Sequence, residues 1–289
     1  MRRSLPLILA VLGVFSSFAV AQDTIADVQA KAEAGDKVAQ FLLGRAYYSG
    51  SDGLPRDEIT AMPWFRKAAD QGQVNAQTYL GYMYEEGRGV KKDEAQAVEW
   101  YRKAAEQGER NAQRNLGMMY ADGRGGLTKS DTEAVNWYRK AAEQGDPSAQ
   151  NSLGQMYQRG GGSLKQDVGE ALAWYRKSAD QGYANAQNNA AILMLMNRSP
   201  EIRNPRGALD YASKAVAQYK YNLIFLETLA EAYYVNEQFE QAVETMRQIM
   251  TIAPAEKMTG YTASLDRYQR ALTTISKREL KSAGSFRLK

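Results

Sequence analysis

The nine-residue stretch "WYRKAAEQG" occurs twice in the chain, at Trp100–Gly108 and at Trp137–Gly145. Close variants of it begin at Trp64 and Trp174, so all four tryptophans stand 36 or 37 residues apart. A period in the mid-thirties indicates a stack of small, similar units. Aligned on the tryptophans, the four units are Ala34–Asp70, Gln71–Glu106, Gln107–Glu143 and Gln144–Asp180.

Each unit is predicted to form two helices. In the second unit, the segment near Asn75–Glu86 reads as a helix that stops at Gly87, a residue type that commonly ends helices. A short loop leads to Asp93, which has a glutamine three residues later, the spacing of a helix N-cap. Ser130 and Asp167 stand at the equivalent places of the next two units. The sequence therefore predicts an all-α fold, an α-solenoid of antiparallel helix pairs.

The second helix of each unit is apolar on two adjacent faces. Such a helix is expected to pack against its own partner helix and against the next unit. We expect the tryptophan to fill the gap between neighbouring units, and Trp137→Ala to cost about 3–5 kcal/mol of stability. In the second unit the two faces hold Ala95, Val98 and Tyr101, and Ala97, Trp100 and Ala104.

Glycines recur inside the first helices, at Gly81, Gly117 and Gly154. Glycine in a helix interior costs about 1 kcal/mol relative to alanine. No turn is expected at these positions, so the glycines are predicted to permit close contact between helices.

The recurring pattern "AQ-x-x-LG-x-x-Y", a glycine-rich loop and then "W-Y/F-R-K-A/S-A-E/D-Q-G" resembles the Sel-1-like repeat, a relative of the tetratricopeptide repeat. The resemblance covers Ala34–Asp180. It implies a right-handed superhelix of helix pairs with a concave protein-binding face. Proteins of this family act as adaptors, in bacteria often in the envelope or towards a host.

The chain divides into four segments. Residues 1–21 are predicted to be a signal peptide, and residues 22–180 an N-terminal cap helix followed by four Sel-1-like repeats. Residues 181–254 resemble a degenerate fifth repeat and a tetratricopeptide-like repeat. Residues 255–289 are predicted to be a capping helix, over about Ser264–Leu280, and a basic tail with eight Lys/Arg against three Asp/Glu.

The first residues have the layout of a secretory signal. Arg2 and Arg3 precede an apolar run, and Ala19-Val20-Ala21 offers a small-residue cleavage site before Gln22. An uncleaved membrane anchor is the alternative, although the run is short for a span. The chain has no cysteine, so a lipoprotein anchor attached to cysteine and disulfide bonds are both excluded. We expect an exported protein, periplasmic or secreted.

The composition argues against catalysis. The chain contains neither histidine nor cysteine, which excludes imidazole bases, thiol nucleophiles and most zinc sites. The glycine-rich loops follow helix ends instead of opening a helix after a strand, so they are predicted to be turns and not phosphate-binding loops. We expect no enzyme activity, no cofactor and no metal. The alternative is that the protein is an enzyme, either a cell-wall hydrolase or a β-lactam hydrolase.

Binding residues are expected where first helices differ between units, because shared residues build the scaffold. Tyrosine and arginine are typical interface anchors, and amides can hydrogen-bond to an extended backbone. Asn75, Asn111 and Asn185, which precede "AQ", either clamp a ligand backbone or stabilise the first helical turn. The candidate protein-binding residues of the concave face are Phe41, Arg45, Tyr48, Thr78, Tyr82, Glu85, Arg114, Met118, Asn151 and Gln155.

The expected partner is another protein, bound by a monomer. The acidic body, with 27 Lys/Arg against 30 Asp/Glu in residues 22–254, does not suit nucleic acid. Two alternatives remain open: an envelope polysaccharide in the same groove, and contact of the basic C-terminal helix with an anionic membrane surface.

Overall fold

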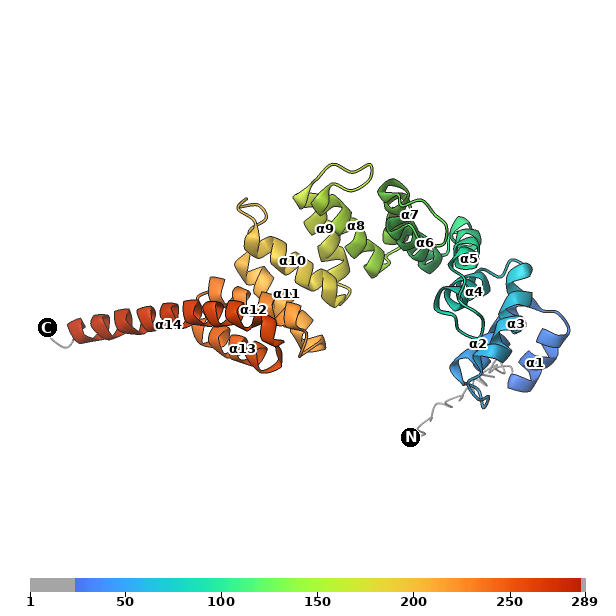
Figure 1. The fold of residues 1–289 in the computed structure, drawn as a ribbon, viewed down its shortest axis with the longest axis horizontal. Coiled ribbons are helices and arrows are strands. Elements are labelled where there is room, and N and C mark those ends of the chain that lie inside the picture. Colours follow the sequence, from blue (N-terminus) through green and yellow to red (C-terminus); the bar gives the residue numbers. More distant parts are fainter. Residues whose placement is uncertain (1–23, 287–289) are drawn as a thin grey trace, which may run out of the picture.

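The computed structural model describes residues 24–286, with side chains for residues 24–277, and this part of the chain is helical with connecting turns and loops (Figure 1). The predicted signal peptide lies outside the described residues. Within residues 24–286, no helix combines the length and apolar character needed to cross a membrane. The helices are α1 (Ile25–Glu33), α2 (Lys37–Ser49), α3 (Glu58–Asp70), α4 (Val74–Glu86), α5 (Glu94–Glu106), α6 (Arg110–Asp122), α7 (Asp131–Glu143), α8 (Pro147–Arg159), α9 (Val168–Ala179), α10 (Ala184–Met196), α11 (Pro205–Gln218), α12 (Leu223–Val235), α13 (Phe239–Ile252), the 3-10 turn η1 (Ala255–Lys257) and α14 (Met258–Phe286).

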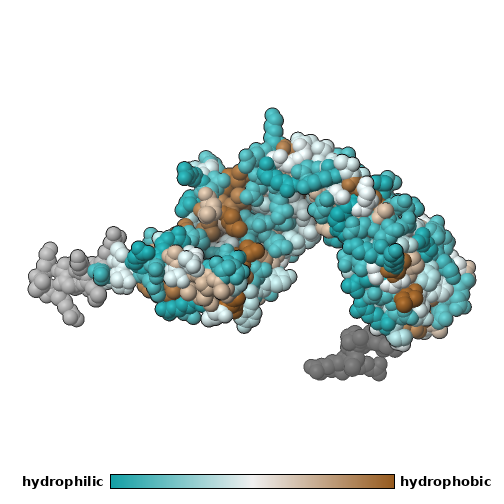
Figure 2. Space-filling view, in the orientation of Figure 1, coloured by the Kyte–Doolittle hydropathy of each residue, from teal (hydrophilic) through white to brown (hydrophobic). Residues whose placement is uncertain are grey.

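The helices pack in consecutive pairs. The even-numbered helices α2 to α12 are the first helices of the pairs, and α3 to α13 are the second helices. Each second helix contacts its own first helix and the helix that follows it, which for α3 to α11 is the first helix of the next pair and for α13 is α14. The pairs follow an arch (Figures 1 and 2), and α2, α4 and α6 lie on its hollow side (Figure 1). The predicted all-α solenoid is confirmed.

The predicted helix ends are confirmed in detail. Gly87 ends α4 in the left-handed conformation, with φ of 70°. The Asp93 carboxylate accepts hydrogen bonds from the first backbone N–H groups of α5. Ser130 and Asp167 cap α7 and α9 in the same way. These polar caps stop each second helix from extending into the preceding loop.

The glycines inside the first helices do mark close contacts. A Cβ atom added to Gly117 would lie 2.8 Å from the ring of Tyr138, which no real Cβ tolerates. The contact partner is therefore the tyrosine that follows each tryptophan. The equivalent pairs are Gly81 with Tyr101, at 2.5 Å, and Gly154 with Tyr175, at 2.7 Å.

The tryptophans are less buried, and contribute less to the packing between units, than the sequence predicts. Trp137 does pack against the core of the preceding pairs, but it is only half-buried. Its outer surface carries Lys140, whose Nζ lies 4.0 Å from the ring centroid. Trp64 and Trp174 are likewise half-buried under lysines, and Trp100 alone is buried. The prediction that Ala95 packs on one face of α5 is wrong, because Ala95 is exposed.

Glutamine pairs join the two helices of the five helix pairs from α2–α3 to α10–α11. Gln113, the glutamine of one "AQ" motif, is buried and donates to the carbonyl oxygen of Ala105 at 3.1 Å. It accepts a hydrogen bond of 2.7 Å from Gln144, the glutamine of "EQG". Four further pairs repeat this contact: Gln40 with Gln71, Gln77 with Gln107, Gln150 with Gln181 and Gln187 with Gln218.

The glycine-rich loops connect neighbouring units. Gly125 has φ of 62°, and an added Cβ would lie 2.4 Å from the backbone oxygen of Glu94. Arg124 from the same loop hydrogen-bonds to the Glu94 carboxylate at 2.7 Å, and this contact lowers the pKa of Glu94 to about 2. Arg88 pairs with Glu58 in the same manner one unit earlier. The loops are therefore turns, as expected, and they also hold neighbouring units together.

The last helix is longer than predicted. It begins at Met258 and runs to Phe286, projecting from the end of the arch in Figure 1. Its first part covers the last pair: Tyr261 donates to Glu227 of α12, and the Tyr268 hydroxyl donates to Glu231 at 3.0 Å. Both tyrosines are buried in the terminal core. This part of α14 caps the solenoid.

Candidate functional site

An open pocket lies where three successive first helices meet. It has a volume of about 370 Å³ and is formed by α2, α4 and α6. We name it the inner-face pocket, because these helices line the hollow side of the arch. Four of the ten predicted residues contribute to it. Its lining residues are Tyr48, Thr78, Tyr79, Tyr82, Asn111, Arg114 and Asn115.

Stacked aromatic rings form the apolar side of the pocket. Tyr79 stacks on the buried ring of Phe65, with 4.8 Å between the ring centroids. Tyr48 meets Tyr79 edge to face at 5.6 Å. Burial raises the pKa of the Tyr48 hydroxyl, and this neutral group can both donate and accept a hydrogen bond. The rings thus give the pocket a rigid surface before any ligand binds.

Tyr82 is the third tyrosine of the pocket. It is half-buried, and the guanidinium of Arg88 lies 5.7 Å from its ring centroid. Arg88 is itself held by Glu58. A partner that contacts Tyr82 therefore meets a ring that is already oriented by a cation on the scaffold.

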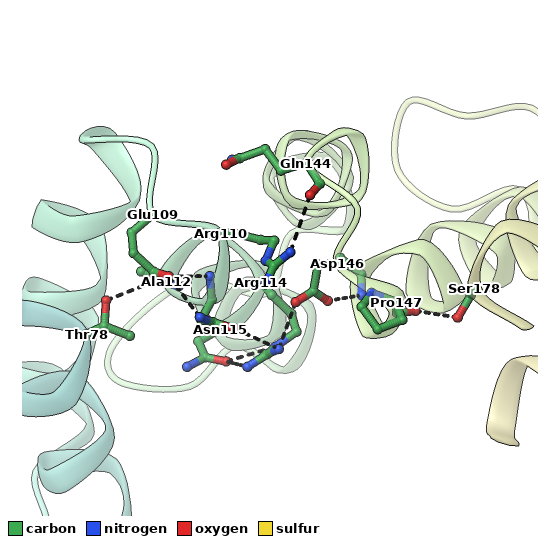
Figure 3. A network of polar contacts seen from close by, with 12 residues as sticks. Thr78, Glu109, Arg110, Ala112, Arg114, Asn115, Gln144, Asp146, Pro147 and Ser178 are labelled. Atoms are coloured by element: carbon green, nitrogen blue, oxygen red, sulfur yellow. Dashed lines mark hydrogen bonds and ion pairs between the residues drawn. The ribbon is translucent and has the colours of Figure 1, made fainter. Parts of the chain in front are cut away.

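The polar side of the pocket is built around Arg114, in the close view of Figure 3. Arg114 forms an ion pair of 2.9 Å with Asp146, whose side chain is buried. Arg114 also donates a hydrogen bond of 3.2 Å to the side-chain amide oxygen of Asn115. Asp146 in turn caps α8, accepting from the backbone N–H of Ala149 at 2.7 Å. Arg114 is therefore fixed in the pocket wall by the next unit.

A second contact between units has the same design. The Thr78 hydroxyl donates to Glu109 at 2.9 Å, as Figure 3 shows. Glu109 caps α6, and it also accepts from the Asn111 side-chain amide at 2.9 Å. The contact with Glu109 favours the view that Asn111 stabilises the first helical turn. Thr78 and Asn111 nevertheless line the pocket, so each has a structural contact and an accessible surface.

Three predicted residues are buried and cannot be surface anchors as they stand. Phe41 is 8 % exposed and packs beneath the pocket against Phe65 and Tyr79. Glu85 is buried, accepting from the Tyr101 hydroxyl at 2.7 Å and from Arg124 at 2.9 Å. Asn151 is buried and accepts from the Asn189 amide at 2.9 Å.

The remaining predicted residues lie outside the pocket. Arg45 and Gln155 are exposed on the first helices α2 and α8. Met118 is half-buried and packs against the core of the α7–α8 region. Their assignment to a binding surface stays a prediction.

Sequence reasoning missed Tyr79 and Asn115. Both follow directly after a predicted position, Thr78 or Arg114, and both vary between units. That variation was a usable signal. Without the helix crossing angles, however, the sequence does not show which of two adjacent positions faces the hollow and which faces the neighbouring unit.

The residues of the inner-face pocket can contact a ligand. Among the described residues, no group of three or more carboxylate side chains is close enough to hold a metal ion. The inner-face pocket brings together tyrosine rings, amides and one guanidinium that is already paired. This arrangement can recognise apolar and hydrogen-bonding groups of a ligand.

The fold and the pocket together define a repeat scaffold, the class of α-solenoid whose helix pairs stack into an extended binding surface. The chain belongs to the Sel1 repeat family. Sel1 repeats, which generally mediate contacts between proteins, match residues 37–73, 74–109, 110–146, 147–183 and 184–219. The last match, residues 184–219, falls in the segment that was expected to be a degenerate fifth repeat.

Two solved structures support the assignment. The chain is 34% identical to c5321, a protective antigen of uropathogenic Escherichia coli with this repeat fold, over 80% of this chain and 49% of that chain, with a TM-score of 0.69. It is 30% identical to a Sel1 repeat protein from Oxalobacter formigenes, over 72% of this chain and 89% of that one, with a TM-score of 0.60.

Among curated proteins, a short stretch is similar to HRD3A of Arabidopsis thaliana, an ERAD-associated component of an E3 ubiquitin-protein ligase. The identity is 39% over 57 residues, which is 20% of this chain and 8% of the relative. The chain thus spans about half the length of c5321 and a small part of HRD3A.

Proposed function

We propose that this protein is a non-catalytic adaptor that binds a segment of another protein in the inner-face pocket. The observation that carries the proposal is the convergence of Tyr48, Tyr79, Tyr82 and Asn115 from three repeats on one open pocket. These positions differ from repeat to repeat, whereas the glutamine pairs and the glycine contacts that hold the fold recur.

The chemistry of the pocket suits a polypeptide. Tyrosine rings provide large contact areas with little loss of side-chain entropy, and they are frequent interface hot spots. The Asn111 and Asn115 side chains can pair with backbone N–H and C=O groups. Because Arg114 is neutralised by Asp146, recognition relies on apolar side chains and hydrogen bonds more than on net charge.

The first test is capture of the partner by crosslinking tagged protein in its native compartment, followed by mass spectrometry. The informative variant is Tyr82→Ala with Asn115→Ala, because both residues line the pocket. Neither side chain carries a buried ion pair, so the fold should persist. Arg114→Ala is less suitable, because it would leave the buried Asp146 carboxylate unpaired at a cost of about 3–5 kcal/mol.

We expect the wild type to capture a specific protein. The double variant should capture at least about tenfold less of it. The matched control is Lys91→Ala with Glu99→Ala, two exposed residues of the α4–α5 loop and of the second helix α5. The control should capture as much as the wild type. Equal capture by all three proteins, each with an unchanged melting temperature, would rule out the inner-face pocket.

We further propose that the protein is exported, with the periplasm as its site of action. The signal-like residues 1–21 support this, and the similarity to a protective antigen of a bacterial pathogen is in keeping with it. Mass spectrometry of the protein from fractionated cells should find a chain that starts at Gln22 in the periplasmic fraction. An intact N-terminus in the cytoplasm would contradict export.

A further inference from the structure

A second open pocket lies between the starts of α10 and α12. These helices are several repeats away from α2, α4 and α6 (Figure 1). The volume of this second pocket is about 300 Å³. We name it the edge pocket, because it opens at the turns between repeats. Its side-chain lining consists chiefly of Tyr183, Asn185, Gln218, Tyr219, Asn222 and Phe225.

Tyr183 departs from the repeat at this pocket. At the starts of α2, α4, α6 and α8 the N-cap residue is Asp36, Gln73, Glu109 or Asp146, and each side chain accepts from the helix backbone. At the start of α10 the N-cap is Tyr183, and it makes no such hydrogen bond. A polar N-cap side chain raises the equilibrium constant for helix formation by about tenfold. Tyr183 does not provide this stabilisation, so the fold alone does not explain why a tyrosine stands here.

The next turn, which precedes α12, also departs from the repeat by carrying an aromatic residue. Tyr219 replaces the glycine of the "QG" motif found at the previous turns, where that glycine has positive φ. Tyr219 is 57% exposed, Tyr221 is 74% exposed, and the Tyr219 ring lies edge to face with Phe225 at 6.0 Å. Aromatic rings are thus presented to solvent at two consecutive turns.

The lining of the edge pocket carries no charged side chain, although charged residues make up 24% of the chain. It combines aromatic rings with the amides Asn185, Gln218 and Asn222. Below the pocket lining, the side-chain amide oxygen of the buried Asn188 in α10 has no hydrogen-bond partner among the described residues. The equivalent residues Thr78 and Arg114 reach the N-cap of the next first helix, and here that N-cap is Asn222.

We propose that the edge pocket binds a neutral saccharide. The C–H face of a pyranose ring packs on exposed tyrosine rings, and its hydroxyl groups pair with amides that both donate and accept. An acidic glycan or a charged peptide would find no counter-charge in the lining. The volume of about 300 Å³ lies at the lower end of the range of small-ligand pockets.

The test is titration of the full mature chain with neutral oligosaccharides of glucose and of N-acetylglucosamine, followed by NMR or calorimetry. We expect one of the two series to bind in the millimolar range or tighter, and Tyr219→Ala with Tyr221→Ala to weaken binding at least about tenfold. Polygalacturonate, an acidic glycan, should not bind.

A sharper variant is Tyr183→Asp, which restores the polar cap of the other repeats. It should leave the melting temperature unchanged or raise it while weakening saccharide binding. Ile59→Ala, which alters a side chain as exposed as Tyr221, should bind like the wild type. Binding of neither series, binding unaffected by the tyrosine variants, or displacement of the sugar by an extended peptide at lower concentration would each overturn the proposal.

Discussion

Tyr138→Ala is expected to lower the free energy of unfolding by about 3–5 kcal/mol. Tyr138 is 4% exposed and packs against Gly117 of its partner helix. Burial raises the pKa of its hydroxyl to about 12, in keeping with a ring enclosed by protein. Its loss would open a cavity between α6 and α7, which the flanking alanines Ala134 and Ala141 are too small to fill.

The adjacent Trp137→Ala is expected to cost roughly half as much, because Trp137 is only half-buried and transfer free energy scales with buried area. Urea denaturation of both variants compares two neighbouring aromatic residues of one helix. A larger loss for Trp137→Ala would contradict this account and would restore the tryptophan as the principal contact between units.

Gly117→Ala is expected to destabilise the protein by about 1–3 kcal/mol. In an open helix the same change stabilises by about 1 kcal/mol, since alanine is the better helix former. Here the new methyl group would lie 2.8 Å from the Tyr138 ring, which is itself held in the core. Overpacking therefore outweighs helix propensity.

The matched control is Gly260→Ala. Gly260 also lies in a helix, α14, but a Cβ added there has no atom within 4 Å. This variant should be neutral or more stable by up to about 1 kcal/mol. Thermal unfolding of both proteins measures the difference, and a stabilised Gly117→Ala would show that α6 and α7 are not in the close contact described.

The repeated phrases predicted the fold well because each local signal is repeated four or five times. Asp93, Ser130 and Asp167 marked helix starts, and Gly87 a helix end, before any contact was known. The relative burial of Trp137 and Tyr138 was not predictable in this way. Both residues are aromatic and adjacent, and only the crossing of α6 and α7 determines which ring meets the glycine.

The candidate site was predicted in part. Variation between repeats identified Tyr48, Thr78, Tyr82 and Arg114, which the structure brings together. The same criterion also selected Glu85, which is buried in contacts with Tyr101 and Arg124. Variation alone does not separate residues that bind a partner from residues that pair with a neighbouring repeat.

The central claim is that the inner side of the early repeats binds a protein. Hydrogen exchange of the captured complex, compared with the free protein, tests it most directly, because bound surfaces exchange more slowly. We expect slower exchange in α2, α4 and α6 and unchanged exchange in α3, α5 and α7. Protection confined to the second helices or to α14 would contradict the claim and would place the partner elsewhere on the solenoid.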